Sequence, residues 1–199
     1  MSNYVANKII CKKEFYKKYL LDLNPFGDEI PDGYVKTHPY ITFNKLYNVE
    51  SLNEYGEKYG TYVYYGFGHS VRELDKDNVE ILFQTRWLYP IYAIVKAIEL
   101  DHNIVWYAVE ENIIYISRFE WNKNKVVEKV LDLGNDKFDE WYDKNIMNDN
   151  IYDNLEPCDD TTWYFNNYNE KDWKLWDTDD LIKRYESRYP SKEYFDEME

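Results

Sequence analysis

The sequence lacks the features of several protein classes. It contains only two cysteines in 199 residues, Cys11 and Cys158, which is too few for a disulfide scaffold or a structural zinc site. No apolar run approaches the roughly 20 residues that a membrane-spanning helix requires. The first residues do not have the charged-then-apolar layout of a signal peptide, and the chain has no internal repeat. These features predict a reduced, cytoplasmic protein.

The sequence also has no recognisable catalytic or metal-binding pattern. His38, His69 and His102 lie in separate segments, and none has a second histidine three or four residues away, as a metal site generally requires. The DTDD sequence at 177–180 lacks the other ligands and the glycine of an EF-hand loop. Carboxylate pairs are abundant, but a chain with 38 acidic residues produces them by chance. We therefore expect no enzymatic activity, no metal and no cofactor.

What the sequence has in excess is negative charge, and this charge is unevenly distributed. Residues 1–130 carry 18 acids and 16 bases, a net charge of −2, whereas residues 131–199 carry 20 acids and 8 bases, a net charge of −12. A surface that grips phosphate needs the opposite sign, so direct nucleic-acid binding by the C-terminal third is disfavoured. A basic protein partner is favoured, although acidity can also serve solubility alone.

Hydrophobic periodicity predicts strands and helices in the order strand, helix, strands, helix, strands. The predicted strands cover residues 2–11, 40–49, 78–87, 103–112, 113–121 and 125–133, with a hairpin turn at Glu110, Glu111 and Asn112. The predicted helices cover residues 12–23, a segment opening at Pro90, an acidic segment around Phe138, Trp141 and Tyr142, and a segment capped by Thr178. Residues 51–78 contain four glycines and receive no assignment.

Apolar residues at helical spacing predict which side chains these helices bury. The predicted buried positions are Phe15, Tyr16, Tyr19, Leu20 and Leu23 in the first helix, Ile91, Ile94, Val95 and Ile98 in the second, and Leu181, Ile182, Tyr185 and Tyr189 in the last. Short hairpins combined with helices predict an α+β fold, an antiparallel sheet with helices on one face. We expect one domain at 1–130 and an acidic C-terminal extension at 131–199 packed on it.

Several short stretches in the first part of the chain carry a family resemblance. They are SNYVANKIICKKEFY at the start, FNK at 43–45, TRWLYP at 85–90 before a helix, and the paired strands around EEN and SRF, which include Arg118. Over residues 2–130 the chain resembles the YubB/Api92-like ferredoxin-fold family of phages and other mobile elements, although Gln84 and Arg86 depart from the usual Asp and small residue. The resemblance implies a ferredoxin-like fold and a mobile-element origin, and it carries over no catalytic residue.

The segment 159–180, DDTTWYFNNYNEKDWKLWDTDD, interleaves seven carboxylates with six aromatic rings. One interpretation makes Trp163, Trp173 and Trp176 core residues that hold the extension on the sheet. A second makes the segment a decoy that occupies the basic groove of a nucleic-acid-binding protein. A third uses the rings to stack bases of single-stranded nucleic acid, which the charge of this segment disfavours. Stacking remains open on the sheet, whose flank includes Lys8, Lys12, Lys13, Lys17 and Lys18.

We favour the decoy interpretation and predict a non-enzymatic inhibitor of a host defence effector, of the anti-CRISPR or anti-restriction type, acting in the host cytoplasm. The predicted partner-binding residues are Asp159, Asp160, Trp163, Glu170, Asp172, Trp173, Trp176, Asp177, Asp179 and Asp180. As a helix, this segment carries about one net charge per 6–7 Å, against one per 1.7 Å in duplex DNA. Acids from 132–156 and 186–199 must therefore converge with it. The alternative is a ferredoxin-like module that binds RNA or single-stranded DNA.

Overall fold

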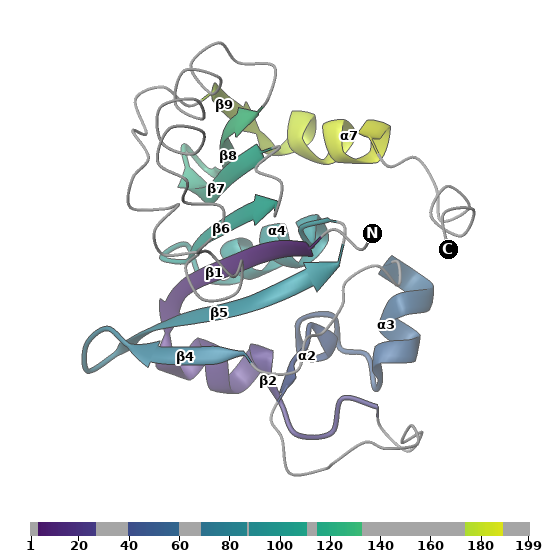
Figure 1. Ribbon diagram of the computed structural model, residues 1–199, viewed down its shortest axis with the longest axis vertical. Coiled ribbons are helices and arrows are strands. Elements are labelled where there is room, and N and C mark those ends of the chain that lie inside the picture. The colour runs from purple at the N-terminus through teal and green to yellow at the C-terminus, as the bar shows by residue number, and fades with distance from the viewer. Residues whose placement is uncertain are drawn as a thin grey trace, which may run out of the picture.

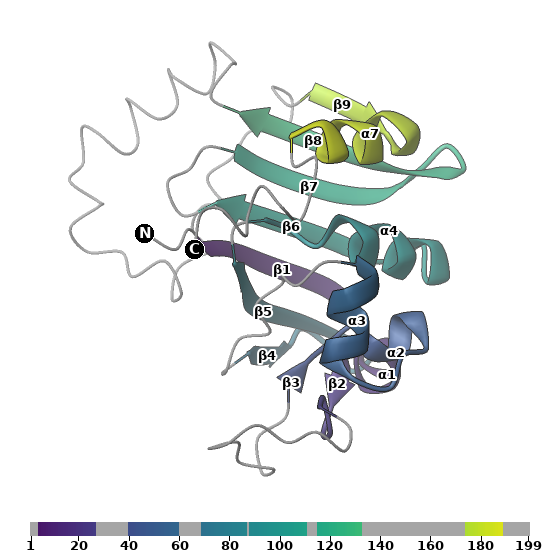
Figure 2. The same ribbon diagram turned by 90° about the vertical axis from the view of Figure 1, so that its right-hand side faces the viewer.

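The computed structural model describes residues 4–26, 40–59, 69–86, 88–110, 115–132 and 174–188. Within these ranges the fold is α+β, as predicted, with one seven-stranded antiparallel sheet in the order β4-β5-β1-β6-β7-β8-β9 and helices on one face (Figures 1 and 2). The strands of this sheet are β1 (Tyr4–Lys12), β4 (Ser70–Glu73), β5 (Asn78–Arg86), β6 (Val105–Glu110), β7 (Tyr115–Asn122), β8 (Lys125–Asp132) and β9 (Lys174–Asp177). The helices are α1 (Lys13–Phe15) with its continuation η1 (Tyr16–Leu20), α2 (Asn44–Tyr47), α3 (Leu52–Tyr59), α4 (Ile91–Leu100) and α7 (Thr178–Arg188). A second sheet pairs β2 (Leu21–Asp22) with β3 (Tyr40–Ile41).

Strand β1 lies in the interior of the main sheet and pairs with two strands that are distant in the sequence. Val5 lies opposite Thr85 of β5 and opposite Glu110 of β6, so β1 is flanked on both sides. Side chains alternate between the two faces of a strand. The apolar residues at 5, 9 and 11 of β1 therefore share a face with those at 79, 81 and 83 of β5, and all six are buried in the core. The alternation read from 78–87 is confirmed wherever the structure describes this stretch.

The helices cover this apolar face of the sheet. Ile91, Ile94, Val95 and Ile98 of α4 are all buried in the same core as the strand residues, as their spacing predicts. Leu181 of α7 is also fully buried, and Ile182 and Tyr185 pack against the core. Tyr189 lies outside the described residues, as do Phe138, Trp141 and Tyr142 of the predicted acidic helix.

The first helix is shorter than its apolar spacing predicts. Phe15, Tyr16 and Leu20 are buried and Tyr19 is partly buried, as expected, but the helix ends at Leu20 in a wider π-type turn. Residues 21–22 then form β2, and Leu23 is 65% exposed. The prediction that Leu23 is buried is therefore wrong, because pairing with β3 turns the chain out of the helix before that residue is reached.

The prediction of an extended segment over 40–49 is also largely wrong. Only Tyr40 and Ile41 are extended, and α2 follows at 44–47. The Asp22 carboxylate organises this change, because it accepts hydrogen bonds from Thr42 Oγ1 at 2.8 Å and from Asn44 Nδ2 at 3.3 Å. These three side chains are buried. In the previously unassigned stretch 51–78, α3 and β4 form.

The hairpins after α4 follow the prediction with one correction. β6 and β7 are antiparallel neighbours, but Glu110 is the last residue of β6 rather than part of the turn. β7 and β8 are joined by Lys123 and Asn124, whose φ angles of 47° and 69° are both positive. A two-residue connection of this kind matches the right-handed twist of its strands.

Candidate partner-binding surface

The predicted partner-binding residues fall into two groups. Six of them lie between Asp159 and Trp173, outside the described residues. Trp176 and Asp177 belong to β9, where their backbones pair with Glu128 and Val127 of β8. Asp179 and Asp180 lie in the first turn of α7, the position at which negative charge favours a helix.

Residues 133–173, which we call the acidic segment, connect β8 to β9, and the pairing of these two strands holds the two ends of the segment side by side. Residues 133–173 connect Asp132 of β8 to Lys174 of β9, and Val130 pairs directly with Lys174. A connection of 41 residues between neighbouring antiparallel strands is far longer than the few residues that a hairpin requires, and long connections in compact domains are commonly functional. The acidic segment is thus attached to the sheet at both ends.

The excess negative charge of the chain lies outside the described residues. The described residues contain 19 acids and 19 bases, a net charge of zero, so the net −14 of the whole chain is carried by the remainder. Segment 133–173 alone contains 11 acids and 3 bases, a net charge of −8. The uneven charge seen in the sequence therefore corresponds to a sheet and helices that are neutral overall and a strongly acidic connection between β8 and β9.

Helix α7 is held on α4 by a cluster of tyrosines. The ring of Tyr185 lies 5.6 Å from that of Tyr89 and 6.2 Å from that of Tyr92. The hydroxyl of Tyr92 donates a hydrogen bond to Glu186 Oε1 at 2.9 Å. Burial raises the pKa of Tyr92 to about 12, and the hydrogen bond to Glu186 and the charge of that carboxylate add to the shift. The hydroxyl is therefore a stable donor at neutral pH.

The sheet face opposite the helices carries a row of cationic side chains around one aromatic ring. Lys8, Tyr107, Arg118 and Lys129 lie opposite one another on four consecutive strands. Lys8 Nζ lies 4.7 Å from the centroid of the Tyr107 ring, and the Arg118 guanidinium carbon lies 5.6 Å from it. Such distances are within the range of cation–π attraction. This row is the feature of the described sheet that most resembles a nucleic-acid-binding face.

The charges of this row are engaged within the protein. Glu120 forms ion pairs with Arg118 at 2.9 Å and with Lys129 at 2.8 Å. Lys8 is only 5% exposed, and burial lowers its pKa; the charge of Glu80 opposes the shift, whereas Arg72 and Arg118 reinforce it. A base that stacked on Tyr107 would compete with the contacts that Lys8 and Arg118 already make with this ring. The arrangement therefore favours a structural role for the row.

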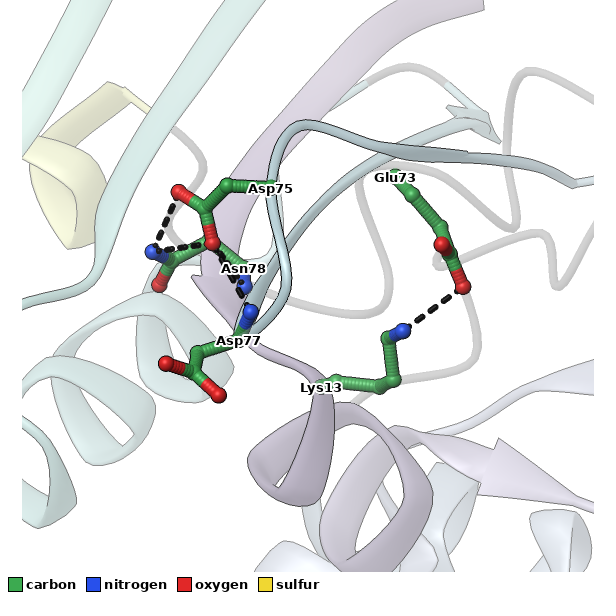
Figure 3. Close-up of polar contacts among 5 residues, drawn as sticks. All are labelled: Lys13, Glu73, Asp75, Asp77 and Asn78. Atoms are coloured by element: carbon green, nitrogen blue, oxygen red, sulfur yellow. Dashed lines mark hydrogen bonds and ion pairs between the residues drawn. The ribbon is translucent and has the colours of Figure 1, made fainter.

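A second polar cluster fixes the β4–β5 turn to the start of α1 (Figure 3). Asp75 Oδ1 accepts hydrogen bonds from the backbone N–H groups of Asp77 at 2.8 Å and Asn78 at 2.9 Å. Lys13 Nζ reaches Glu73 Oε1 at 2.6 Å, and its backbone N–H donates to the carbonyl of Asp77. The turn and the N-terminal end of α1 are thus joined by both backbone and side-chain contacts.

Three residues with potential chemical reactivity, one cysteine and two histidines, have ordinary structural environments. Burial raises the pKa of the Cys11 thiol to about 12, and the charge of Asp101 adds to this, so the thiol stays protonated at neutral pH. His69 Nε2 lies 3.0 Å from the Tyr16 hydroxyl, and burial lowers the pKa of this histidine. His102 stacks on the Trp121 ring at 3.7 Å. Among the described residues, no group of three or more histidine, cysteine or acidic side chains is placed to hold a metal ion.

Sequence reasoning predicted the apolar residues of α7 that pack on the core, but it missed the hydrogen bond that joins α7 to α4. Tyr92 and Glu186 are 94 positions apart, and only the tertiary fold brings them together. The available signal was the spacing of Leu181 and Tyr185, which identified the face of α7 that packs on the core. In the part of the chain that the structure describes, no helix has the length and apolar character to cross a membrane. No protein-family model, curated protein or solved structure matches this chain.

Proposed function

We propose that this protein is a non-enzymatic inhibitor that binds a basic host protein through its acidic C-terminal part and blocks a groove that otherwise accepts nucleic acid. A CRISPR effector or a restriction enzyme would present such a groove in the host cytoplasm. The observation that carries the proposal is the separation of charge: the described residues are neutral overall, and the 41-residue connection between β8 and β9 has a net charge of −8.

The attachment of this segment supports a binding role for it. An extended acidic tail would lose much conformational freedom on binding, which weakens affinity. Here both ends are fixed by pairing of β8 with β9, so part of that loss has already occurred on folding. Trp163 and Trp173 lie within the segment, and Trp176 follows in β9; rings of this kind are enriched among residues that dominate binding energy.

We also propose that residues 4–110 form a ferredoxin-like unit. The order β4-β5-β1-β6, with α1 and η1 after β1 and α4 after β5, supports this, because it corresponds to two interleaved strand–helix–strand units in an antiparallel sheet. Strands β7, β8 and β9 then extend the sheet on one side. The same fold is implied by the resemblance to the YubB/Api92-like family, and a mobile-element origin would suit an inhibitor of host defence.

The competing function is a module that binds RNA or single-stranded DNA on the sheet. The row of Lys8, Tyr107, Arg118 and Lys129 is the observation in its favour. Gel shifts with labelled single-stranded oligonucleotides separate the two functions. The sheet-binding module would shift the oligonucleotide on its own, whereas the inhibitor we propose would not.

Charge neutralisation tests the inhibitor directly. Asp159, Asp160, Asp172, Asp177, Asp179 and Asp180 would be changed to Asn and Glu170 to Gln, and binding to partners from host lysate would be measured at low and high salt. We expect loss of the salt-sensitive partner and loss of its competition with nucleic acid. Unchanged capture and competition by this variant would refute the charge-based mechanism.

A matched pair of variants controls for the loss of net charge and for any effect on the first turn of α7. The first neutralises Asp159, Asp160, Glu170 and Asp172, which leaves the first turn of α7 intact. The second neutralises four exposed acids that lie outside the C-terminal part, Glu14, Glu57, Asp77 and Glu99. Both variants remove four charges, and only the first is expected to lose the partner. Equal losses in both would indicate a general effect of acidity.

A further inference from the structure

Residues 174–188, β9 and α7, form a compact attachment that we call the β9–α7 latch. β9 pairs with β8 over four residues, from Val127 opposite Asp177 to Val130 opposite Lys174. α7 then packs on β8 and on α4. Figures 1 and 2 show both elements at the β8 end of the sheet, with α7 close to α4. The latch therefore contacts the rest of the protein through one strand and one helix.

The contacts of the latch combine apolar burial with specific polar geometry. Leu181 is fully buried in the same core as Val130 of β8. Tyr185 packs against Tyr89 and Tyr92, and the Tyr92 hydroxyl bonds Glu186. The apolar contacts supply affinity, whereas the hydrogen bond and the strand register define one orientation.

We propose that the β9–α7 latch is an autonomous docking element, which binds the surface formed by β8 and α4 without needing a covalent connection through 133–173. Leu181 and Tyr185 are its anchors, and they position the acidic segment by fixing its C-terminal end beside its N-terminal end. This role in positioning rests on the proposed function; the docking itself does not.

The chemistry of the docking surface defines its occupant. β8 offers the backbone edge that β9 fills, and α4 offers the aromatic surface of Tyr92 next to Tyr89. An occupant needs a short strand followed by a helix with apolar residues at successive turns, as Leu181 and Tyr185 provide at a spacing of four. This chain's own 174–188 segment meets both requirements.

Cleavage of the connection in the full-length protein tests the proposal. A specific protease site would be inserted between Asn148 and Asp149, and the folded protein would be cut and examined by native mass spectrometry and light scattering. We expect the two fragments to remain together at the 24.4 kDa of the intact chain, plus the inserted residues, at micromolar concentration. Separation of the fragments under native conditions would overturn the proposal.

Variants of the latch identify its anchors. Leu181→Ala and Tyr185→Ala in the cut protein are each expected to weaken fragment association about tenfold or more, as loss of a buried anchor does. Lys183→Ala, at an exposed position of the same helix, is the matched control and should leave association unchanged. Circular dichroism of the uncut variants establishes that they fold. Equal behaviour of all three variants would contradict the assignment of the anchors.

Partner binding is measured separately, so that the two proposals fail in different ways. If the cut protein stays assembled but neither it nor the uncut chain captures a partner, the proposed function fails and the docking stands. If the fragments separate while the uncut chain captures its partner, the docking fails and the proposed function stands. Weaker capture by uncut Tyr185→Ala than by uncut Lys183→Ala would support positioning of the acidic segment.

Discussion

The indole Nε1 of Trp106 donates a hydrogen bond to Asn7 Oδ1 at 3.0 Å, and both side chains are fully buried. The Asn7 amide in turn donates to Thr85 Oγ1 at 2.9 Å, and Thr85 donates to the carbonyl of Leu88. This chain of bonds crosses β6, β1 and β5 and continues into the segment that leads to α4. A buried polar network of this kind stabilises one arrangement of strands only if every member is satisfied.

Replacing Asn7 by alanine is expected to lower the free energy of unfolding by about 2–3 kcal/mol, because the buried indole N–H of Trp106 loses its acceptor and the Thr85 hydroxyl loses one of its two partners. Trp106→Phe removes the donor while keeping a ring, and the two changes together should be less damaging than the sum of each. Urea unfolding of the four proteins measures this coupling. The change Glu57→Ala, at an exposed position, should stay within about 0.5 kcal/mol, and an equal loss there would count against the network.

The Cys11 thiol is expected to resist modification in the folded protein. Its pKa of about 12 and its burial leave almost no thiolate at pH 8. Labelling with a thiol-specific reagent in a Cys158→Ser variant should be slow in buffer and fast in denaturant. Rapid labelling under native conditions would show that the core around β1 opens readily.

The Tyr92 hydroxyl is expected to make the free energy of unfolding depend on pH in the alkaline range. A tyrosine in the unfolded chain titrates near pH 10, whereas Tyr92 in the folded protein titrates near 12. Between these values the folded state holds more protons than the unfolded state, so its stability falls as the pH rises. Tyr92→Phe is expected to lose stability less steeply than the wild type from pH 10 to 12 in urea titrations. Identical slopes would mean that the proton on Tyr92 is not linked to folding.

The Lys123–Asn124 turn predicts a stabilising substitution. Both residues have positive φ, which glycine adopts without strain and β-branched residues do not. Asn124→Gly is expected to raise the free energy of unfolding by about 0.5 kcal/mol, and Asn124→Val to lower it by about 1–2 kcal/mol. Thermal unfolding distinguishes the two, and a stable Asn124→Val variant would indicate that the β7–β8 connection can take another turn.

Regular patterns in the sequence predicted the parts of the fold that depend on local periodicity. Alternation along β5 and helical spacing along α4 identified their buried faces, because each element presents one face to a shared core. The prediction of an extended segment over 40–49 was wrong because the structure there depends on Asp22, about 20 residues earlier, which accepts hydrogen bonds from Thr42 and Asn44. A contact of that range leaves no local pattern to read.

The candidate site was predictable in its charge but not in its attachment. Counting acids located the excess charge in the last third of the chain. The register that pairs Val130 with Lys174, and the meeting of Tyr92 with Glu186, depend on how the sheet is assembled. Similarly, Lys8 and Arg118 both contact the Tyr107 ring because three strands align. Nothing in the sequence of any single strand indicates that these side chains meet.

The interior position of β1, between two strands that come much later in the chain, has a consequence for synthesis. Its nearest pairing in the main sheet joins Lys12 to Asn78, and the pairing with β6 extends to Glu110. While the chain is still leaving the ribosome, the backbone edges of β1 therefore have no native partner strand in the main sheet until more than 60 further residues have emerged. During that interval β1 has unpaired backbone groups and apolar side chains without their native neighbours, a condition that favours aggregation.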